Sequence, residues 1–337
     1  SGGGLLTSYG KSLSSEILST WGTESEAGFM HGWLDSKLQR EALEKWVLIG
    51  GDVRAVQVHK EDAIMKQGRF VKMQADLALG LVRDLWAAVV NIGEVQDSGV
   101  AEDSLVWRDV GTQYYAMLRP IEELSFRVGR FVPQYGLFSS DHIAFVRNFS
   151  GFGLGARRDV IEAQWTGPVW SGNISLAKQF AEEDPERSWL AQVQYSFQDR
   201  YKLAFNLLHS TTSTARTDLS GLWGVLGFSK RFFWLSEIDR KNVTTKGAGS
   251  AEDNSVGWAS YQKLGYTLFK GFDALFFLES QQSDVRDNET RMRRLGPGFQ
   301  FFPRPHFEVS GALTQQVNMS SDPKEAIYAW ILLHYYL

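Results

Sequence analysis

The hydrophobic pattern of the chain has a period of two over long stretches. In residues 71–81 every odd-numbered position is apolar, whereas Lys72 and Asp76 stand at even-numbered positions. The same alternation recurs in residues 189–198 and again in residues 326–337. Because successive side chains of a β-strand point to opposite faces, this period predicts strands with one apolar and one polar face.

Short and long links alternate between these strands. The short links are predicted at residues 83–84, 120–123, 166–168, 199–200, 229–230, 270–271 and 303–305. The long links are predicted at residues 60–67, 96–103, 131–150, 181–187, 210–218, 239–255, 283–289 and 318–324. Such alternation is typical of membrane barrels, which join their strands by short turns at one end and longer loops at the other. The prediction is an all-β chain that forms one transmembrane antiparallel up-and-down β-barrel of about 16 strands, with about 14 to 18 compatible with the pattern.

The distribution of aromatic residues favours a barrel that is apolar outside and polar inside. The chain contains 12 Trp and 22 Phe, and aromatics make up 13% of its residues. Aromatic side chains gather near the ends of the apolar faces, as the girdles of a membrane barrel require. The chain has no run of 18 apolar residues, so a helical membrane protein is excluded.

The closing strand carries a resemblance to a known family. Ile327, Ile331, Leu333, Tyr335 and Leu337 share one face, and the sequence stops there. In this ending and in its layout, the chain from 44 to 337 resembles porin-like β-barrels of the Gram-negative outer membrane, although that family usually ends in Phe. The resemblance implies an outer-membrane location, contact with membrane lipids and lipopolysaccharide, a homo-oligomer, and passive diffusion of small hydrophilic solutes and ions.

Residues 1–43 differ from the rest of the chain. Residues 8–20 and 34–46 are each compatible with a short amphipathic helix, and residues 27–35 are compatible with a further strand. We expect a periplasmic or lumenal segment here. The alternative of extra strands stays open.

The longest link, residues 131–150, is the candidate functional element. It is too apolar to stand free in water, so it either folds into the lumen, packs on a neighbouring subunit or caps the outside of the barrel. In porins an inward-folded loop narrows the pore. The resemblance therefore implies a constriction between residues of this loop and residues of the facing wall. Separately, strand alternation predicts that three more side chains point into the lumen. The loop residues are Asp141, His142 and Arg147, the facing residues are Arg127, Arg130 and Arg158, and the further wall positions are Lys72, Asp76 and Glu162. Their mixed signs predict weak ion selectivity.

The sequence excludes several other classes of function. It has no cysteine for thiol metal sites, and a net charge of -4 gives no basic field for nucleic acid. No cofactor or metal is expected. Ser139, Ser140, Asp141 and His142 invite comparison with a catalytic triad, but triad members meet through the fold and not through adjacency, so we expect no enzyme. Two alternatives stay open. Residues 1–43 are compatible with the plug of a transporter for a hydrophobic substrate, and the apolar faces of the barrel are compatible with a structural, lipid-interacting oligomer. Residues 232–235 and 275–278 are apolar on both faces, which suits either a partly hydrophobic lumen or a contact with lipid or with another subunit.

Overall fold

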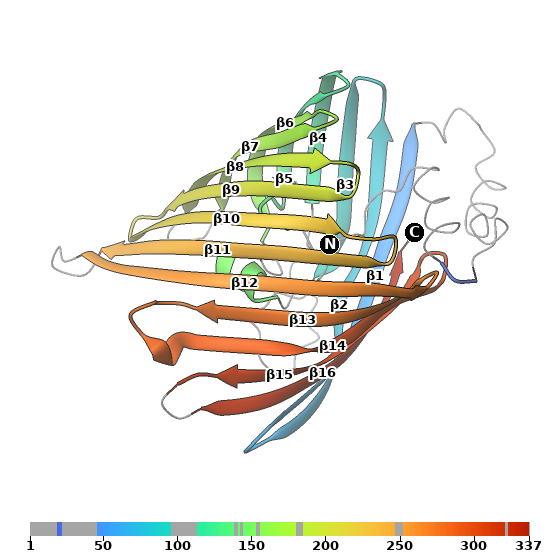
Figure 1. Cartoon of the computed structure of the whole chain (residues 1–337). Helices are drawn as coiled ribbons and strands as arrows, with labels where there is room; N and C mark the ends of the chain where they lie inside the picture. Colours follow the sequence, from blue (N-terminus) through green and yellow to red (C-terminus); the bar gives the residue numbers. More distant parts are fainter. Residues whose placement is uncertain are drawn as a thin grey trace.

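The segments with a period of two form strands that close into one barrel (Figure 1). The computed structural model describes residues 19–21, 46–95, 113–137, 141, 144–152, 156–179, 185–246, 252–320 and 323–336. The strands are β1 (Val47–Asp62), β2 (Lys66–Val82), β3 (Trp86–Val95), β4 (Gln113–Ile121), β5 (Leu124–Phe131), β6 (Arg158–Thr166), β7 (Trp170–Gln179), β8 (Glu186–Phe197), β9 (Tyr201–Thr211), β10 (Ala215–Gly227), β11 (Phe232–Lys246), β12 (Glu252–Phe269), β13 (Phe272–Gln282), β14 (Arg291–Arg304), β15 (Phe307–Asn318) and β16 (Lys324–Tyr336).

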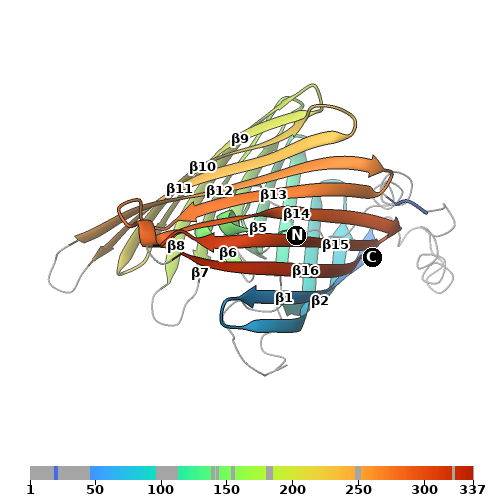
Figure 2. The same cartoon turned by 60° about the horizontal axis from the view of Figure 1, so that its bottom comes forward.

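Each strand pairs antiparallel with its neighbours in sequence, and β1 closes the ring by pairing with β16 (Figure 2). The prediction of an all-β antiparallel barrel with about 16 strands is confirmed. Two short helices, α5 (Phe145–Ser150) and the 3-10 helix η2 (Asn288–Thr290), lie in links. Within the ranges given above, no helix is long and apolar enough to cross a membrane.

The outer surface of the barrel is apolar and the inner surface is largely polar. Ile161 is 63% exposed on the outside, whereas its neighbour Glu162 is 1% exposed on the inside. On the closing strand, Ile331 and Leu333 point outward and His334 points inward. An apolar outer face with a polar lumen is the arrangement of a barrel in lipid, so the inside-out prediction is confirmed.

One strand departs from the predicted alternation. Arg54 pairs with Gln74, but the next residue, Ala55, pairs with Lys72, so Met73 is an extra residue in β2. A β-bulge of this kind shifts the alternation by one position. Lys72 therefore shares the outer face with Ala55, and its predicted position on the lumen wall is wrong.

The short links lie at one end of the barrel, as predicted, but several long links are shorter than expected. Residues 239–246 and 252–259 pair as strands, although the sequence pattern predicted a loop at 239–255. The links at 63–65 and 212–214 are tight. The predicted long links at 96–103 and, for the most part, 181–187 lie outside the described ranges. Short turns face the periplasm in bacterial barrels, and β1 begins and β16 ends at that same side.

The strands of the barrel differ in length, so the wall is higher on one side of the barrel than on the other. β5 has 8 residues and β12 has 18. Figure 1 shows β11 and β12 projecting at the loop end, beyond the strands around β5.

Only residues 19–21 of the predicted N-terminal segment are described. The backbone N–H groups of Thr20 and Trp21 donate to the carbonyl oxygens of Phe302 (2.9 Å) and Pro303 (3.0 Å). The Thr20 hydroxyl donates to the carbonyl of Lys270 at 2.6 Å. This short piece therefore lies on the turns at the periplasmic end. Apart from residues 19, 20 and 46, which are not helical, the predicted helices lie outside the described residues, as does the extra strand. A lumenal position for the segment stays a prediction.

Candidate pore constriction

The link between β5 and β6, residues 132–157, folds into the barrel; we name it the lumenal loop. Its short helix α5 contacts β11, β12 and β13, on the far side of the lumen from the loop's own attachment. The loop is thus neither a cap outside the barrel nor a free segment. Of the three arrangements that the sequence allowed, inward folding is the one observed.

Three carboxylates on the facing wall hold the loop through hydrogen bonds. Oε2 of Glu237 accepts from the backbone N–H of Leu137 at 3.0 Å, and Oδ1 of Asp239 accepts from the Tyr135 hydroxyl at 3.1 Å. Oε2 of Glu279 accepts from the backbone N–H of Phe145 at 2.7 Å. Hydrogen bonds to charged groups contribute more than neutral ones, and these carboxylates are buried by the loop itself.

A basic side chain completes the attachment from the same wall. Nζ of Lys241 donates to the backbone carbonyl of Phe149 at 3.0 Å. Phe149 lies at the carboxyl side of α5, where helix carbonyls lack partners within the helix. The wall thus supplies acceptors for the N–H groups of the loop and a donor for one of its carbonyls.

Gly136 allows the loop to approach the wall closely. Its φ is 67°, in the left-handed region that favours glycine, and a Cβ at this position would lie 1.9 Å from Oε1 of Glu237. No other residue type fits here without moving Glu237.

Apolar packing covers the rest of the contact. Leu137, Ala144, Val146 and Phe149 of the lumenal loop form one cluster with inward-facing side chains of β9 to β15. The wall members are Ala204, Trp223, Ala259, Tyr261, Leu275, Phe277 and Ala312. This packing explains why the wall is apolar on both faces at residues 275–278: the outward residues meet lipid and the inward ones meet the loop.

The predicted loop residues lie at this contact. Asp141 accepts hydrogen bonds from the Tyr261 hydroxyl and from Nζ of Lys263, the latter at 3.3 Å. Arg147 in α5 is 4% exposed. His142 lies outside the described residues. The charges of Asp141 and Arg147 are therefore directed at β11 and β12, and the structure does not place them opposite the arginines of β5 and β6.

The predicted wall residues divide into an inward and an outward group. Arg127 forms an ion pair with Glu162 at 2.6 Å, and the Ser175 hydroxyl donates to the same carboxylate at 2.9 Å. Arg158 pairs with Glu186 at 3.1 Å. These side chains face the lumen.

Arg130 is a correction to the sequence prediction. It pairs across strands with Tyr114 and Asp159, on the side where Val128 and Tyr114 are exposed on the outside of the barrel. Because cross-strand partners share a face, Arg130 points away from the lumen.

A second polar cluster inside the barrel was not predicted. Arg54 forms an ion pair with Asp52 at 3.0 Å, and His334 lies between Asp52 (2.9 Å) and Glu308 (3.0 Å). Asp76 points inward, opposite Asp52, and accepts from Gln74. These residues come from β1, β2, β15 and β16, so only closure of the ring brings them together. Each of the inward charges named here lies near a group of opposite sign or a hydrogen-bond donor.

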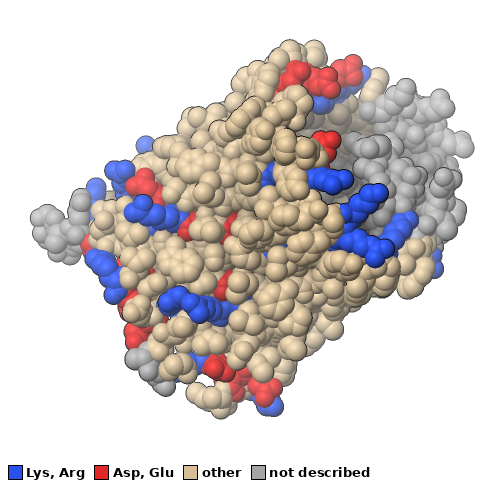
Figure 3. Space-filling model, in the orientation of Figure 1, with Lys and Arg blue, Asp and Glu red and all other residues tan. Residues whose placement is uncertain are grey.

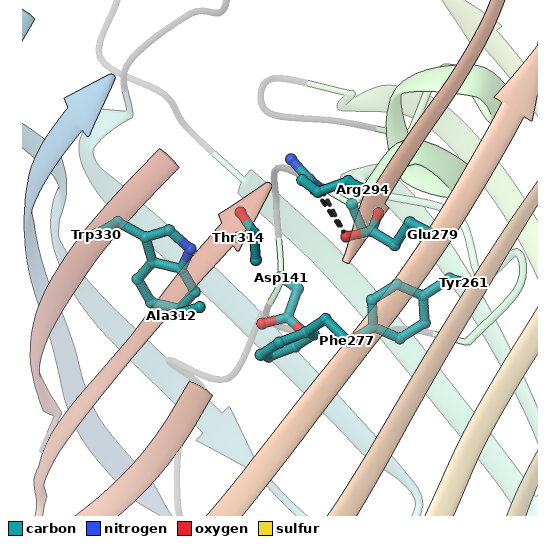
Figure 4. A pocket seen from close by; sticks show the side chains of 9 residues that line it. Asp141, Tyr261, Phe277, Glu279, Arg294, Ala312, Thr314 and Trp330 are labelled. Carbon is teal, nitrogen blue, oxygen red and sulfur yellow. Dashed lines mark hydrogen bonds and ion pairs between the residues drawn. The ribbon is translucent and has the colours of Figure 1, made fainter. Parts of the chain in front are cut away.

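A recess inside the barrel lies beside the loop (Figure 4). It is bounded by Asp141, the Glu279–Arg294 ion pair (2.7 Å) and the Trp330 ring. Figure 4 shows Asp141 reaching from the loop toward side chains of the wall. The loop narrows the lumen without filling this corner.

A closed ring of antiparallel strands, a lipid-facing outer surface, a polar inner wall and a long loop folded inward define a transmembrane barrel of the porin type. Solved structures agree with that class. The chain is similar to an outer membrane channel, DcaP, of Acinetobacter baumannii, with 12% identity and a TM-score of 0.64 over 86% of this chain and 97% of that chain.

Two further solved structures show the same fold. An anion-selective porin from Comamonas acidovorans matches with 12% identity and a TM-score of 0.66 over 86% of this chain and 99% of that one. OprB of Pseudomonas putida matches with 10% identity and a TM-score of 0.62 over 96% of this chain and 99% of that one. No protein-family model matches the chain, and no curated protein matches it in sequence. At these identities the similarity is one of fold.

Proposed function

We propose that the chain is a passive diffusion channel for small hydrophilic solutes and ions in the outer membrane of a Gram-negative bacterium. The single observation that carries the proposal is the position of the lumenal loop, packed on β11 to β13. A barrel of about 16 strands is too wide to be filled by its own side chains. The loop also packs, through Tyr135 and Phe152, on apolar inward residues of β6 to β10. The polar inward residues that remain on β5, β1 and β16, among them the partly exposed Arg127, are left to line a water-filled path. The porin and channel structures with the same fold support this proposal.

The charges on these walls favour weak ion selectivity. Arg127 and Arg158 are matched by Glu162 and Glu186, so neither sign dominates. Of these, the Arg127 side chain is 26% exposed and would act most directly on a passing ion.

One alternative, a transporter for a hydrophobic substrate, receives less support. A transporter for a hydrophobic substrate would need an apolar path, but the inward apolar side chains Leu275 and Phe277 are covered by the loop. The proposal requires no catalysis. Of the Ser-Ser-Asp-His string, only Asp141 is described, and it is engaged by Tyr261 and Lys263.

Single-channel conductance in a planar bilayer tests the proposal. Steady conductance steps from the full chain are expected, and the same steps from a chain lacking residues 1–43 would place that segment outside the path. A silent full chain with a conducting truncation would instead support a plug. Silence of both forms, with a folded barrel, would contradict the channel. We further propose that identical barrels associate, and concerted steps would give the number of subunits.

A further inference from the structure

The outer face of the barrel carries a cluster of polar side chains on β8 to β11, near the loop end. Strand pairing arranges the cluster in two rows, and cross-strand partners share a face. One row consists of Trp189, His209, Asp218 and Asn242, and the next row toward the short turns contains Leu207, Ser220 and Arg240. A shallow hollow on the outer face is bounded by residues of both rows.

The cluster lies at the polar border of the lipid-facing surface. The row below it, toward the short turns, is apolar and exposed, and consists of Val193, Phe205, Leu222 and Ile238. The row above it contains Arg187, Thr211 and Arg216. Figure 3 shows charged side chains gathered at the left of the molecule, where β11 ends and β12 begins, beside a broad zone without charge. In a bilayer such a border lies at the depth of the ester groups of lipids, between the acyl chains and the headgroups.

Asp218 orients the imidazole ring of His209. Nδ1 of His209 lies 2.7 Å from Oδ1 of Asp218. Because a carboxylate can only accept, Nδ1 carries the proton, and Nε2 of the neutral ring keeps a lone pair. Nε of Arg216 donates to Oδ2 of the same carboxylate at 3.0 Å, and the Trp189 ring stacks on the imidazole at 6.0 Å. The ring is thus held in one tautomer, with Nε2 available to take a proton.

Ser220 is the nucleophile that this base can serve. It follows Asp218 by two positions on β10, so the two side chains share the outer face, and it is a diagonal cross-strand neighbour of His209. Diagonal neighbours lie about 7 Å apart, within reach of an aromatic side chain. The Ser220 hydroxyl forms no hydrogen bond with any residue that the structure describes, His209 included. Hydrogen bonds of this kind are often long before a substrate binds and tighten with it.

Arg240 supplies a positive charge beside the nucleophile. It lies directly opposite Ser220 on β11, and the Cβ atoms of such a pair are about 5 Å apart. Arg240 is exposed and forms no ion pair within the described part of the chain. Its guanidinium can therefore donate to an oxygen atom that becomes negative next to Ser220.

We propose that Ser220, His209 and Asp218 form a hydrolase site for the fatty-acyl esters of lipids in the outer leaflet. This activity goes beyond the proposed channel, because the site lies on the lipid-facing surface and not in the lumen. The three residues form no short motif in the sequence, and only the pairing of β9 with β10 brings them together. The prediction of no enzyme concerned residues 139–142, which have no part in this site.

The reaction proceeds in two balanced steps. The Ser220 oxygen attacks the carbonyl carbon of the ester while Nε2 of His209 takes the hydroxyl proton, and Arg240 stabilises the negative carbonyl oxygen. The bond to the lipid alcohol then breaks, His209 returns the proton to the alcohol oxygen, and the acyl group stays on Ser220. Water attacks this acyl-serine in the same way, which releases the fatty acid and restores the Ser220 hydroxyl. The acyl chain rests on the exposed apolar row throughout.

The nucleophile is tested by labelling the purified full-length protein with an alkyl fluorophosphonate, from which an activated serine displaces fluoride. Mass spectrometry should find the adduct on Ser220, and His209→Asn should slow its formation by about 1,000-fold or more. The matched control is Ser260→Ala, which removes another outward-facing serine, on β12, whose cross-strand partners are Ile238 and Ser280. This control should be labelled like the unaltered protein.

Asp218 is a positioning residue, and its role is tested by two substitutions. Asp218→Asn offers Nδ1 an amide in place of a carboxylate and should slow labelling by about 100-fold, whereas Asp218→Glu should restore part of the rate. Equal rates in the two variants would overturn the role given to Asp218.

The substrate is tested by the release of fatty acid from vesicles of diether phosphatidylcholine, which has no ester to cleave. The vesicles contain either phosphatidylglycerol or an acylated disaccharide glycolipid, so the lipid that releases fatty acid identifies the source of the ester. Release that Ser220→Ala abolishes would support the proposal. Release that persists in Ser220→Ala, no release from either lipid, or no adduct on Ser220 would overturn it. Conductance of Ser220→Ala should be unchanged, because Ser220 faces lipid, so the channel and the hydrolase can fail separately.

Discussion

Single carboxylates on the inner wall determine where the lumenal loop lies. Glu237, Asp239 and Glu279 each accept a hydrogen bond from the loop, which also covers them. Because a carboxylate that is removed from water without a hydrogen-bond partner costs several kcal/mol in general, these bonds allow the loop to pack over the three side chains. At this scale the constriction depends on a few residues on each side.

Gly136→Ala is expected to loosen the loop. The new Cβ would meet Glu237, and the left-handed backbone would cost about 1 kcal/mol more for alanine. Limited proteolysis should cut within residues 132–157 faster, whereas the heat-modifiable barrel should remain. Gly151→Ala is the matched control, because Gly151 has a φ of 80° but no atom within 4 Å of its Cβ position. Equal cleavage of the two variants would show that the contact with Glu237 is unimportant.

Glu162→Gln is expected to move ion selectivity toward anions. The substitution leaves the Arg127 charge without its ion pair at 2.6 Å, so the lumen wall gains one net positive charge. The reversal potential in a salt gradient measures this shift. Arg127→Gln should shift it in the opposite direction, and the double variant should lie near the unaltered protein. A shift of the same sign in both single variants would contradict a role for the pair in the pore.

At the scale of elements, β13 shows how one strand serves two environments. Phe277 is 5% exposed and packs on the lumenal loop, whereas Phe276, its neighbour, is 42% exposed on the outer face. The period of two separates the contact with the loop from the contact with lipid.

Phe277→Ala is expected to raise single-channel conductance. Truncation of a buried phenylalanine typically costs about 3 kcal/mol, and here that cost falls on the docking of the loop. Phe276→Ala removes a ring of the same kind from the outer face and should leave the conductance unchanged. If both variants conducted alike, packing on Phe277 would not hold the loop in place.

The strands could be predicted from the sequence because lipid on one side and water on the other impose a strict alternation. The alternation failed at two kinds of place. The bulge at Met73 adds one residue and leaves no mark in composition, so Lys72 was placed on the wrong face. Residues 239–246 are polar because β11 projects beyond the membrane, and a polar strand end resembles a loop in sequence.

The candidate site was less predictable than the fold. That the apolar link needed cover followed from its composition. Its partners Glu237, Asp239 and Glu279 could not be predicted, because they lie 100 to 134 residues further along the chain and only closure of the barrel brings them near the loop. The cluster of Asp52, His334 and Glu308 was missed for the same reason: it exists only where the first and last strands meet.

At the scale of the whole molecule, residues 19–21 are fastened to the periplasmic turns. Trp21 packs edge-on against the Phe301 ring at 5.7 Å, and Arg304 donates to the Trp21 carbonyl at 3.3 Å. Trp21→Ala is expected to release this contact and to speed proteolysis before residue 46, with unchanged conductance. A changed conductance would show that the contact bears on the path for solutes.

The unequal lengths of β5 and β12 also bear on how the channel meets its surroundings. At about 3.4 Å per residue, β12 runs about 60 Å and β5 about 27 Å along the strand direction. The rim of the barrel on the loop side is therefore oblique, higher at β12 than at β5. Among the strands that the structure describes, β11 and β12 extend farthest beyond the bilayer on this side and β5 extends least. An antibody raised against whole cells would therefore reach the strand ends of β11 and β12 before the strand end of β5.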